Sequence, residues 1–339
     1  MRSEMGKQQS GRLRVTVLTG GTSAEREVCL MSGRKVVGAL DPARYETRSV
    51  DLAAIAGDRA RDLAEILFSP PEAGTDAPAA SAERDGKPDV VFIALHGGTG
   101  ENGTVQGMLE LLGIPYTGSG VLASALAMNK IMSKKIFERE GIPTPRWQAA
   151  RASDPQGALR AAKAIGLPCV VKPACEGSTI GVSIVREADG LQAALDTAFG
   201  FGPEALIEEF VQGVEITGPI LGNDDARVLP LVEIVPSSGF YDYEAKYTPG
   251  ATQEIVPARV SEATAQRAQE LALGAHHALG CRGISRVDMI VAPDEIYVLE
   301  VNTIPGLTDT SLVPRAAEAE GMSFPELADL LIELALEGR

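Results

Sequence analysis

The stretch from Ile284 to Gly306 constrains the fold of this 339-residue chain most strongly, because polar and apolar side chains alternate on both sides of a short turn. Alternation with a period of two is typical of a β-strand, and here it predicts a hairpin with one polar face. The residues expected on that face are Arg286, Asp288, Ile290, Val298, Glu300 and Asn302.

The predicted turn of this hairpin spans residues 293–295. A three-residue loop would place Asp288 opposite Glu300 and Arg286 opposite Asn302. Two carboxylates and one amide then converge on one face of a sheet. Mg²⁺ prefers oxygen ligands and commonly binds a substrate phosphate as well, so the pattern predicts a magnesium and phosphate site.

The alternative interpretation is an amphipathic hairpin whose polar face only contacts water. The sequence NTIPG that follows favours a ligand site, because a Pro-Gly turn ending at Gly306 leaves the backbone open to close approach. Arg286, beside the carboxylates, is suited to stabilising an oxyanion. The short pattern alone leaves both interpretations open.

Composition excludes several classes of protein. The net charge of -15 argues against a nucleic-acid or anionic-membrane surface, and no apolar run is long enough to span a membrane. A hydrophobic content of 45% over this length suggests two or three domains. Residues 1–11 predict a disordered leader rather than a signal peptide. Four cysteines without metal-binding spacing are expected to be reduced: Cys29, Cys169, Cys175 and Cys281.

The first strand and the turn after it predict a ligand cradle. Residues 13–18 are expected to form a strand, followed by a glycine turn and a helix over 24–40. This arrangement binds anions and substrates in open α/β sheets. Glu25 stands at the helix start, where it is either a site residue or a helix cap, since Thr22 and Glu25 have the spacing of a capping box.

A second parallel strand is predicted over 89–95, and it ends at His96 beside several glycines. Ligands bind at the carboxyl ends of strands in open sheets, so a substrate contact is one interpretation of His96. A structural histidine is the other. His276 and His277 lie in a predicted helix over 262–279 and are interpreted as surface or packing residues.

Lysines in the middle of the chain predict phosphate contacts. A single helix over 122–140 carries Lys130 and two further lysines. Lys172 precedes the glycine-rich residues 176–181, and strands are expected on both sides. Such a flap can lay backbone N–H groups over phosphates, although a flexible β-hairpin without a ligand has the same pattern.

Three later segments have two interpretations each. The predicted strand over 205–210 carries Glu208 and Glu209, which either accept hydrogen bonds from a nucleotide or face water. A Gly-Pro pair at 218–219 interrupts the next strand, where we expect an edge or a bulge. The tyrosine-rich residues 240–247 are either a surface loop or a lid over a site.

Eight short segments are spread in order over nearly the whole chain beyond the leader. They are GGTSAERE from Gly20, ALHGGTGENGTVQG from Ala94, PYTGSG from Pro115, KPACEGSTIG from Lys172, YDYEAKY from Tyr241, RVDM from Arg286, EVNTIPG from Glu300 and TSLVP from Thr310. Together they resemble the D-alanine:D-alanine ligase family of the ATP-grasp superfamily. The resemblance implies an α/β (α+β) ATP-grasp fold with an open N-terminal α/β domain over 12–121. A central subdomain over 122–212 and a C-terminal domain over 213–339 would hold ATP between them.

The same resemblance implies an enzyme that joins two D-alanines to D-alanyl-D-alanine through a D-alanyl phosphate. It would release ADP and phosphate and serve peptidoglycan precursor synthesis. The implied cofactors are ATP and two Mg²⁺ ions, with Mn²⁺ as a substitute. The implied state is a cytoplasmic homodimer without a nucleic-acid or membrane partner.

Roles of single residues are also implied by the resemblance. ATP would be bound by Lys130, Lys172, Glu208, Glu209, Val211 and Glu215, and the metal by Asp288, Glu300 and Asn302. The two D-alanines would be bound by Glu25, His96, Lys246, Ser311 and Leu312. The catalytic set would be Glu25, Ser178 and Tyr247, which close the lid, with Arg286 and the Gly306 N–H as the oxyanion pair.

Asn129, Thr179 and the pair at 174–175 depart from the family pattern, but none removes a named catalytic group. An ATP-binding module without turnover would need a lost metal ligand or oxyanion group, and all are present. Another carboxylate–amine ligase of the superfamily would have no reason to keep the GGTSAERE and TSLVP segments. Tyr247 within YDYEAKY resembles ligases that join two D-alanines, and relatives that use D-serine or D-lactate are the alternative.

Overall fold

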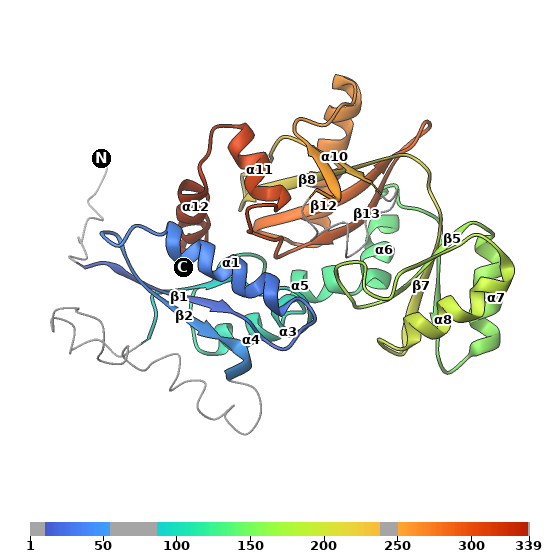
Figure 1. The fold of residues 1–339 in the computed structure, drawn as a ribbon, viewed down its shortest axis with the longest axis horizontal. Coiled ribbons are helices and arrows are strands. Elements are labelled where there is room, and N and C mark those ends of the chain that lie inside the picture. The colour runs from blue at the N-terminus through green and yellow to red at the C-terminus, as the bar shows by residue number, and fades with distance from the viewer. Residues whose placement is uncertain (1–10, 55–86, 238–249, 338–339) are drawn as a thin grey trace.

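The computed structural model describes residues 11–54, 87–237 and 250–337. Three sheets with helices packed on them form an N-terminal unit, whose strands are blue, a central unit in yellow-green, and a C-terminal unit whose hairpin β12–β13 is orange to red (Figure 1). No helix in these ranges is long and apolar enough to cross a membrane. Most of the expected leader, and the segment with Lys246 and Tyr247, lie outside the described residues.

The N-terminal unit is built on a parallel sheet with the order β2-β1-β3, which confirms both predicted strands. Because the strands run in one direction, the glycine turns after β1 and β3 meet at the same edge. The elements are β1 Leu13–Thr19, α1 Arg26–Ala39, β2 Tyr45–Asp51, η1 Leu52–Ala54, β3 Val90–Ile93, α3 Gly98–Glu101, α4 Thr104–Leu111 and α5 Val121–Met128.

The central unit is an antiparallel sheet with the order β4-β7-β5-β6. Strand alternation places Cys169 and Val171 in a core with the helices α7 and α8, and leaves Val170 and Lys172 on the opposite face, which lines a pocket. The elements are β4 Trp147–Arg151, α7 Pro155–Ile165, β5 Cys169–Pro173, β6 Ser183–Val185, η3 Ala188–Gly190, α8 Leu191–Phe199 and β7 Glu204–Glu209.

The C-terminal unit is a larger sheet with the order β11-β10-β8-β12-β13, and β9 also pairs with β8. One face packs on α10 and α6, and the other face turns toward the central unit. The elements are α6 Lys130–Arg139, β8 Val214–Gly222, β9 Arg227–Val228, β10 Val232–Pro236, β11 Thr252–Ile255, α10 Glu262–Ala278, β12 Gly283–Val291, β13 Ile296–Asn302, α11 Leu312–Ala319 and α12 Phe324–Leu336.

The predicted hairpin exists as β12 and β13, and Asp288 lies opposite Glu300 as expected. The three-residue loop was wrong, because Val291 pairs directly with Ile296 and leaves four residues between the strands. A register shift next to Asp288 offsets the longer loop, because Leu299 is an extra residue in β13. Asp288 and Glu300 are therefore still paired. Val298 therefore packs fully buried in the core instead of sharing the polar face.

The single helix expected over 122–140 was also wrong. It is divided into α5 and α6 at Asn129, whose backbone is extended with φ -86° and ψ 95°. The Asn129 side chain accepts a hydrogen bond from the Met132 N–H at 3.1 Å and so caps α6. The break places Lys130 at the first position of α6, where its N–H bonds to the Ala174 carbonyl at 2.8 Å.

Strand β8 is interior and pairs with β12 in an unbroken register, so the expected edge or bulge at 218–219 was wrong. Pro219 lies opposite Arg286 of β12. Along the other edge of β8, β10 pairs with residues 216–217 and β9 pairs with residues 220–221, so neither strand pairs with Pro219. The Pro219 carbonyl accepts from the Leu229 N–H at 2.8 Å in the gap between these partners. The missing N–H of proline is tolerated because no strand needs it at that point.

The C-terminal helices return to the N-terminal unit. One core cluster combines Val17 and Phe92 of the parallel sheet with Leu327 and Leu331 of α12, and α12 contacts α1 and β3. Figure 1 shows α12 beside α1 at the end of the chain. The N-terminal turns are thereby held against the segment that follows β13.

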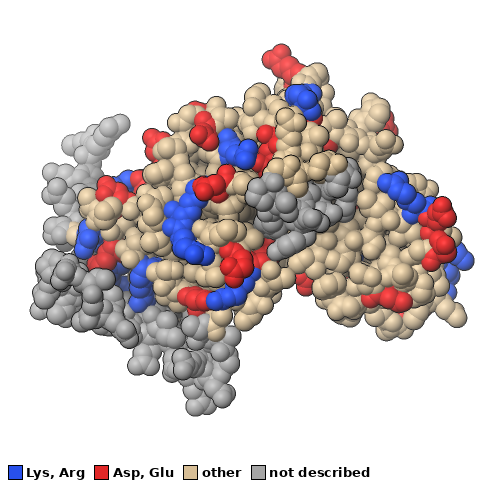
Figure 2. All heavy atoms as spheres, viewed as in Figure 1, with Lys and Arg blue, Asp and Glu red and all other residues tan. Residues whose placement is uncertain are grey.

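Charge on the surface is mixed. Figure 2 shows acidic and basic side chains interspersed over the visible face of the described residues. The four cysteines are free thiols, and three of them are buried, in line with the expected reduced state. His276 is buried and bonds to Ser285 Oγ at 2.7 Å, whereas His277 is exposed, as a packing and a surface residue would be.

Candidate active site

Two adjoining pockets lie where the three units meet. The N-terminal pocket is formed by the turns after β1 and β3, the flap after β5 and the segment after β13. The intersheet pocket lies between the central sheet and the β8-β12-β13 face. Their common wall is made of four residues: Lys130, Glu176, Gly177 and Glu300.

Every predicted site residue that the structure describes lines at least one of these pockets. Those in the N-terminal pocket are Glu25, His96, Lys130, Ser178, Arg286, Glu300, Asn302, Gly306, Ser311 and Leu312. Those in the intersheet pocket are Lys130, Lys172, Glu208, Glu209, Val211, Glu215, Asp288 and Glu300. Residues from the whole length of the described chain thus gather around one connected space.

Glu25 joins the N-terminal unit to the flap. It stands at the N-cap of α1 but makes no capping bond through its side chain, so the capping interpretation was wrong. Instead its Oε1 accepts a hydrogen bond from the Ser178 hydroxyl. Ser178 and Thr179 both have positive φ, 48° and 62°, a backbone conformation unusual for non-glycine residues and common at functional turns.

Lys130 occupies the common wall. Its Nζ lies 3.0 Å from Glu300 Oε2 and donates to the Glu176 carbonyl at 2.6 Å. Burial by itself lowers the pKa of this ammonium group, but Glu300 and the nearby Glu101 and Cys175 together outweigh burial, and the pKa is raised. Lys130 is therefore a fixed positive charge between the two pockets.

A second buried charge cluster lies at the floor of the intersheet pocket. Glu208 pairs with Lys172 and, at 2.9 Å, with Lys134. Burial alone would raise the pKa of Glu208, but the two lysines outweigh it and lower the pKa. Burial lowers the pKa of Lys134 to about 8. The Lys134 ammonium also donates to Thr144, whose hydroxyl bonds to the Val298 carbonyl at 2.7 Å.

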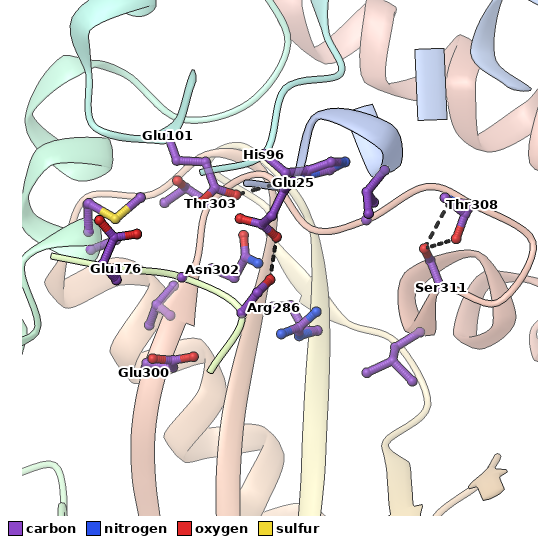
Figure 3. Close-up of a pocket in the computed structure, with 18 of the residues that line it drawn as sticks. Glu25, His96, Glu101, Glu176, Arg286, Glu300, Asn302, Thr303, Thr308 and Ser311 are labelled. Carbon is purple, nitrogen blue, oxygen red and sulfur yellow. Dashed lines mark hydrogen bonds and ion pairs between the residues drawn. The ribbon is translucent and has the colours of Figure 1, made fainter. Parts of the chain in front are cut away.

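Arg286 and Asp288 form a bidentate pair on the polar face of β12. Arg286 Nε lies 2.8 Å from Asp288 Oδ1, and the second contact measures 2.7 Å. Thr217 of β8 donates to the same Oδ1 at 2.6 Å. Figure 3 shows Arg286 and Glu25 between Glu300 on one side and Ser311 on the other.

The segment after β13 approaches the pocket with bare backbone. A Cβ atom at Gly306 would stand 2.7 Å from Ser311 Oγ, so a side chain at this position would require Ser311 to move. Ser311 Oγ accepts from the Thr308 N–H at 2.9 Å and lies 2.8 Å from the Thr308 hydroxyl. Figure 3 shows Thr308 and Ser311 joined at this end of the N-terminal pocket.

His96 lines the N-terminal pocket but is only 4% exposed. Its Nε2 lies 3.0 Å from Ser32 Oγ, and its Nδ1 lies 3.0 Å from the Ile304 carbonyl oxygen. Burial lowers the pKa of the imidazole. Both ring nitrogens are thus engaged by protein groups rather than directed at the open pocket.

Sequence reasoning missed two buried charged residues. Glu101, 8% exposed, lines the N-terminal pocket, and burial followed by repulsion from Glu25 raises its pKa to about 8. Its place beside the glycines after His96 was a usable signal. Lys134 pairs with Glu208 through the fold alone, and no local pattern marks it.

Two sheets enclose a pocket that is lined by buried lysines and acidic residues, and they adjoin an N-terminal unit with an open parallel sheet. This architecture defines an ATP-grasp protein. The family described as D-ala D-ala ligase N-terminus matches residues 14–119, and D-ala D-ala ligase C-terminus matches residues 136–333. The chain belongs to the D-alanine–D-alanine ligase family.

Individual proteins of known family are similar to this chain over nearly its full length. The D-alanine–D-alanine ligase of Syntrophobacter fumaroxidans is 51% identical, covering 96% of this chain and 98% of the relative. The Bacillus anthracis D-alanine–D-alanine ligase complexed with ATP has a TM-score of 0.79 at 36% identity, covering 96% and 98%. The VanG D-Ala:D-Ser ligase of Enterococcus faecalis also has a TM-score of 0.79, at 34% identity, covering 96% and 100%. The fold alone therefore does not distinguish a ligase that joins two D-alanines from one that joins D-alanine to D-serine.

Proposed function

We propose that this chain joins two D-alanines to D-alanyl-D-alanine, with conversion of ATP to ADP and phosphate, as a step of peptidoglycan precursor synthesis. The observation that carries the proposal is the common wall at Lys130 and Glu300, because it joins a pocket suited to a nucleotide with a pocket suited to a small amino acid. Membership of the ligase family supports the reaction.

ATP would occupy the intersheet pocket. Lys130, in the common wall, and Lys172, which lines the intersheet pocket, would bind its phosphates as cations. Glu208, Glu215 and the backbone of 209–211 would bind the adenine and ribose. The similarity to the Bacillus anthracis ligase, whose crystal structure is a complex with ATP, supports this class of ligand.

The residues on the polar hairpin face fit a magnesium site. Asp288, Glu300 and Asn302 supply only oxygen donors, which suits Mg²⁺ and also Mn²⁺. Within the described ranges no three His, Cys, Asp or Glu residues form a metal cluster, so phosphate and water would complete the shell. When bound, two such ions would neutralise phosphate charge.

The first D-alanine would bind in the N-terminal pocket with its ammonium group near Glu25. Its carboxylate oxygen would attack the γ-phosphorus of ATP, with ADP as the leaving group, and form an acylphosphate. Lys130 would hold the transferring phosphoryl group at the common wall. Ser178, bonded to Glu25, would keep the flap closed over this space and exclude water.

The amine of the second D-alanine would then attack the acyl carbonyl. A C–N bond forms, the carbonyl oxygen gains negative charge, and the C–O bond to phosphate breaks as the amine loses its proton. Arg286 and the Gly306 N–H would stabilise that oxygen, with Arg286 oriented by Asp288. Ser311 and Leu312, with Lys246 and Tyr247, would bind the second D-alanine and the phosphate.

We also propose that the second substrate is D-alanine. Two D-alanines are favoured over D-alanine and D-serine by relatives such as that of Syntrophobacter fumaroxidans at 51% identity, against 34% for the D-Ala:D-Ser ligase. We further propose that the protein is a cytoplasmic homodimer and that its domains span residues 12–121, 122–212 and 213–339.

The test is phosphate release from ATP and Mg²⁺ by the purified chain, with products identified by mass. Substrates are D-alanine alone, D-alanine with D-serine, D-alanine with D-lactate, and L-alanine. Release with D-alanine alone and a product of dipeptide mass is expected. Release that needs D-serine or D-lactate would favour the alternative second substrate, and no release with any substrate would contradict the proposal.

A further inference from the structure

A chain of three hydrogen bonds, two of which reach the Gly306 segment, ties that segment to the N-terminal unit. His96 Nδ1 lies 3.0 Å from the Ile304 carbonyl oxygen, and His96 Nε2 lies 3.0 Å from Ser32 Oγ. The Leu307 N–H donates to the same Ser32 Oγ at 3.5 Å, the longest of the three contacts. The bonds therefore hold the backbone on both sides of Gly306, at Ile304 and at Leu307.

For a neutral imidazole, the donors and acceptors in this chain have only one consistent arrangement. A carbonyl oxygen can only accept, so the His96 proton is on Nδ1 and points at Ile304. Nε2 then carries a lone pair and accepts the Ser32 hydroxyl proton. The Ser32 oxygen keeps lone pairs for the Leu307 N–H. The neutral imidazole that this arrangement needs is also the form that burial favours.

The participants are almost completely removed from solvent. Ser32 is 0% exposed, His96 4%, Ile304 5% and Leu307 3%. Water cannot easily replace a lost partner at such positions, so each bond constrains the backbone more than a surface bond would. On its other side Gly306 packs against Ser311, where a Cβ would come within 2.7 Å of Oγ. The segment is thus fixed from both sides.

We propose that Ser32 and His96 are positioning residues that hold the 304–307 segment so that the Gly306 N–H points at the developing oxyanion. His96 acts through the backbone of Ile304 and not as a direct ligand of D-alanine. This inference rests on the proposed function. An oxyanion donor must lie within a few tenths of an ångström of its best place, so a loosened segment weakens amide formation more than substrate binding.

The step that this device serves is amide formation, and phosphoryl transfer occurs elsewhere, at Lys130. Ser32→Ala removes both the donor to His96 and the acceptor for Leu307. We expect a kcat for dipeptide formation lower by about 10- to 100-fold, with the KM for ATP and for the first D-alanine within about twofold. Scrambling of ¹⁸O between the bridge and non-bridge positions of ATP, which reports reversible phosphoryl transfer to D-alanine, should persist.

Two substitutions at His96 separate its two bonds. His96→Asn places an amide N–H where Nδ1 lies and keeps the donor to Ile304, whereas His96→Gln places its amide at the Ser32 end and loses that donor. We expect His96→Asn to retain more of the kcat than His96→Gln. The matched control is Ser124→Ala, since Ser124 is equally buried but bonds to the Ser119 carbonyl, away from both pockets. Its kcat should equal that of the wild type.

Amide hydrogen exchange supplies a readout besides activity. The Leu307 amide should exchange at least about tenfold faster in Ser32→Ala and should be unchanged in Ser124→Ala. A raised KM for D-alanine with unchanged kcat in the His96 variants would make His96 a substrate ligand and overturn the proposal. Equal loss of ¹⁸O scrambling and dipeptide formation, or wild-type kcat and exchange in Ser32→Ala, would also overturn it. A wild-type chain that makes no dipeptide would instead contradict the proposed function.

Discussion

Lys130 Nζ lies 3.0 Å from Glu300 Oε2, and this ion pair forms part of the common wall between the intersheet pocket and the N-terminal pocket. One residue comes from the start of α6 and the other from β13. Their contact brings a cation next to a carboxylate of the hairpin that we propose to bind metal. Phosphoryl transfer would take place beside this pair.

Lys130→Ala should therefore lower the kcat by about 100-fold or more and raise the KM for ATP, because a fixed cation beside the transferred phosphoryl group is removed. Steady-state phosphate release at several ATP concentrations measures both effects. Lys135→Ala is the matched control, since Lys135 lies on the same helix with an exposed side chain. A Lys130→Ala enzyme with wild-type turnover would remove Lys130 from the mechanism.

Gly306→Ala should destabilise the fold and reduce turnover, because its Cβ would stand 2.7 Å from Ser311 Oγ. Overpacking of this kind costs about 1–3 kcal/mol. The double variant Gly306→Ala/Ser311→Ala should regain most of that loss, since the remaining Ser311 Cβ is at 3.6 Å. Urea denaturation of the two single variants and the double variant measures the coupling. Additive losses would show that the two side chains do not compete for space.

Glu101 should make stability depend on pH. Its pKa is raised to about 8 in the folded chain by burial, so the folded state holds a proton that the unfolded state releases above its ordinary value of about 4.5. The contribution of Glu101 is full at low pH and is lost as pH rises to about 8. The free energy of unfolding of the wild type, relative to Glu101→Gln, should fall by up to about 1.4 kcal/mol per pH unit between pH 5 and 8. Parallel pH profiles for the two proteins would contradict a raised pKa.

Removal of divalent metal should abolish turnover, and Mg²⁺ or Mn²⁺ should restore it. Asp288→Asn keeps the shape of the side chain but removes one charge, so more Mg²⁺ should be needed for half-maximal activity. Titration of activity with Mg²⁺ after treatment with a chelator measures the shift. Asp196→Asn, on α8 and outside both pockets, is the control and should leave the titration unchanged. Full activity of the wild type in excess chelator would contradict the metal proposal.

The hairpin at 284–306 illustrates what strand periodicity can and cannot predict. Alternation identified Asp288 and Glu300 as cross-strand partners, and the pairing was confirmed. The predicted loop was one residue too short, and the extra residue Leu299 in β13 was not predicted. These two errors cancel at Asp288, so its pairing with Glu300 was still correct. A bulge depends on packing against neighbouring strands, which a local pattern does not contain.

Helix boundaries and buried charges show the other limits. Asn129 is a good N-cap, but an apolar pattern that continues across it hides the break between α5 and α6. Lys134 and Glu208 meet only because α6 packs across β7, so their pairing follows from the tertiary fold. Gly306 was predicted from its Pro-Gly turn, whereas the partnership of Ser32 and His96 appears only when three distant segments are brought together.

The most direct test of the account follows the carboxylate oxygen of D-alanine. If that oxygen attacks the γ-phosphorus and the acyl C–O bond then breaks, D-alanine labelled with ¹⁸O in its carboxylate must give phosphate that carries one ¹⁸O atom. Mass analysis of the phosphate released with ATP and Mg²⁺ should show one label per phosphate, together with the dipeptide. Unlabelled phosphate would show that ATP is hydrolysed by water without activating the carboxylate, and would contradict the proposed mechanism.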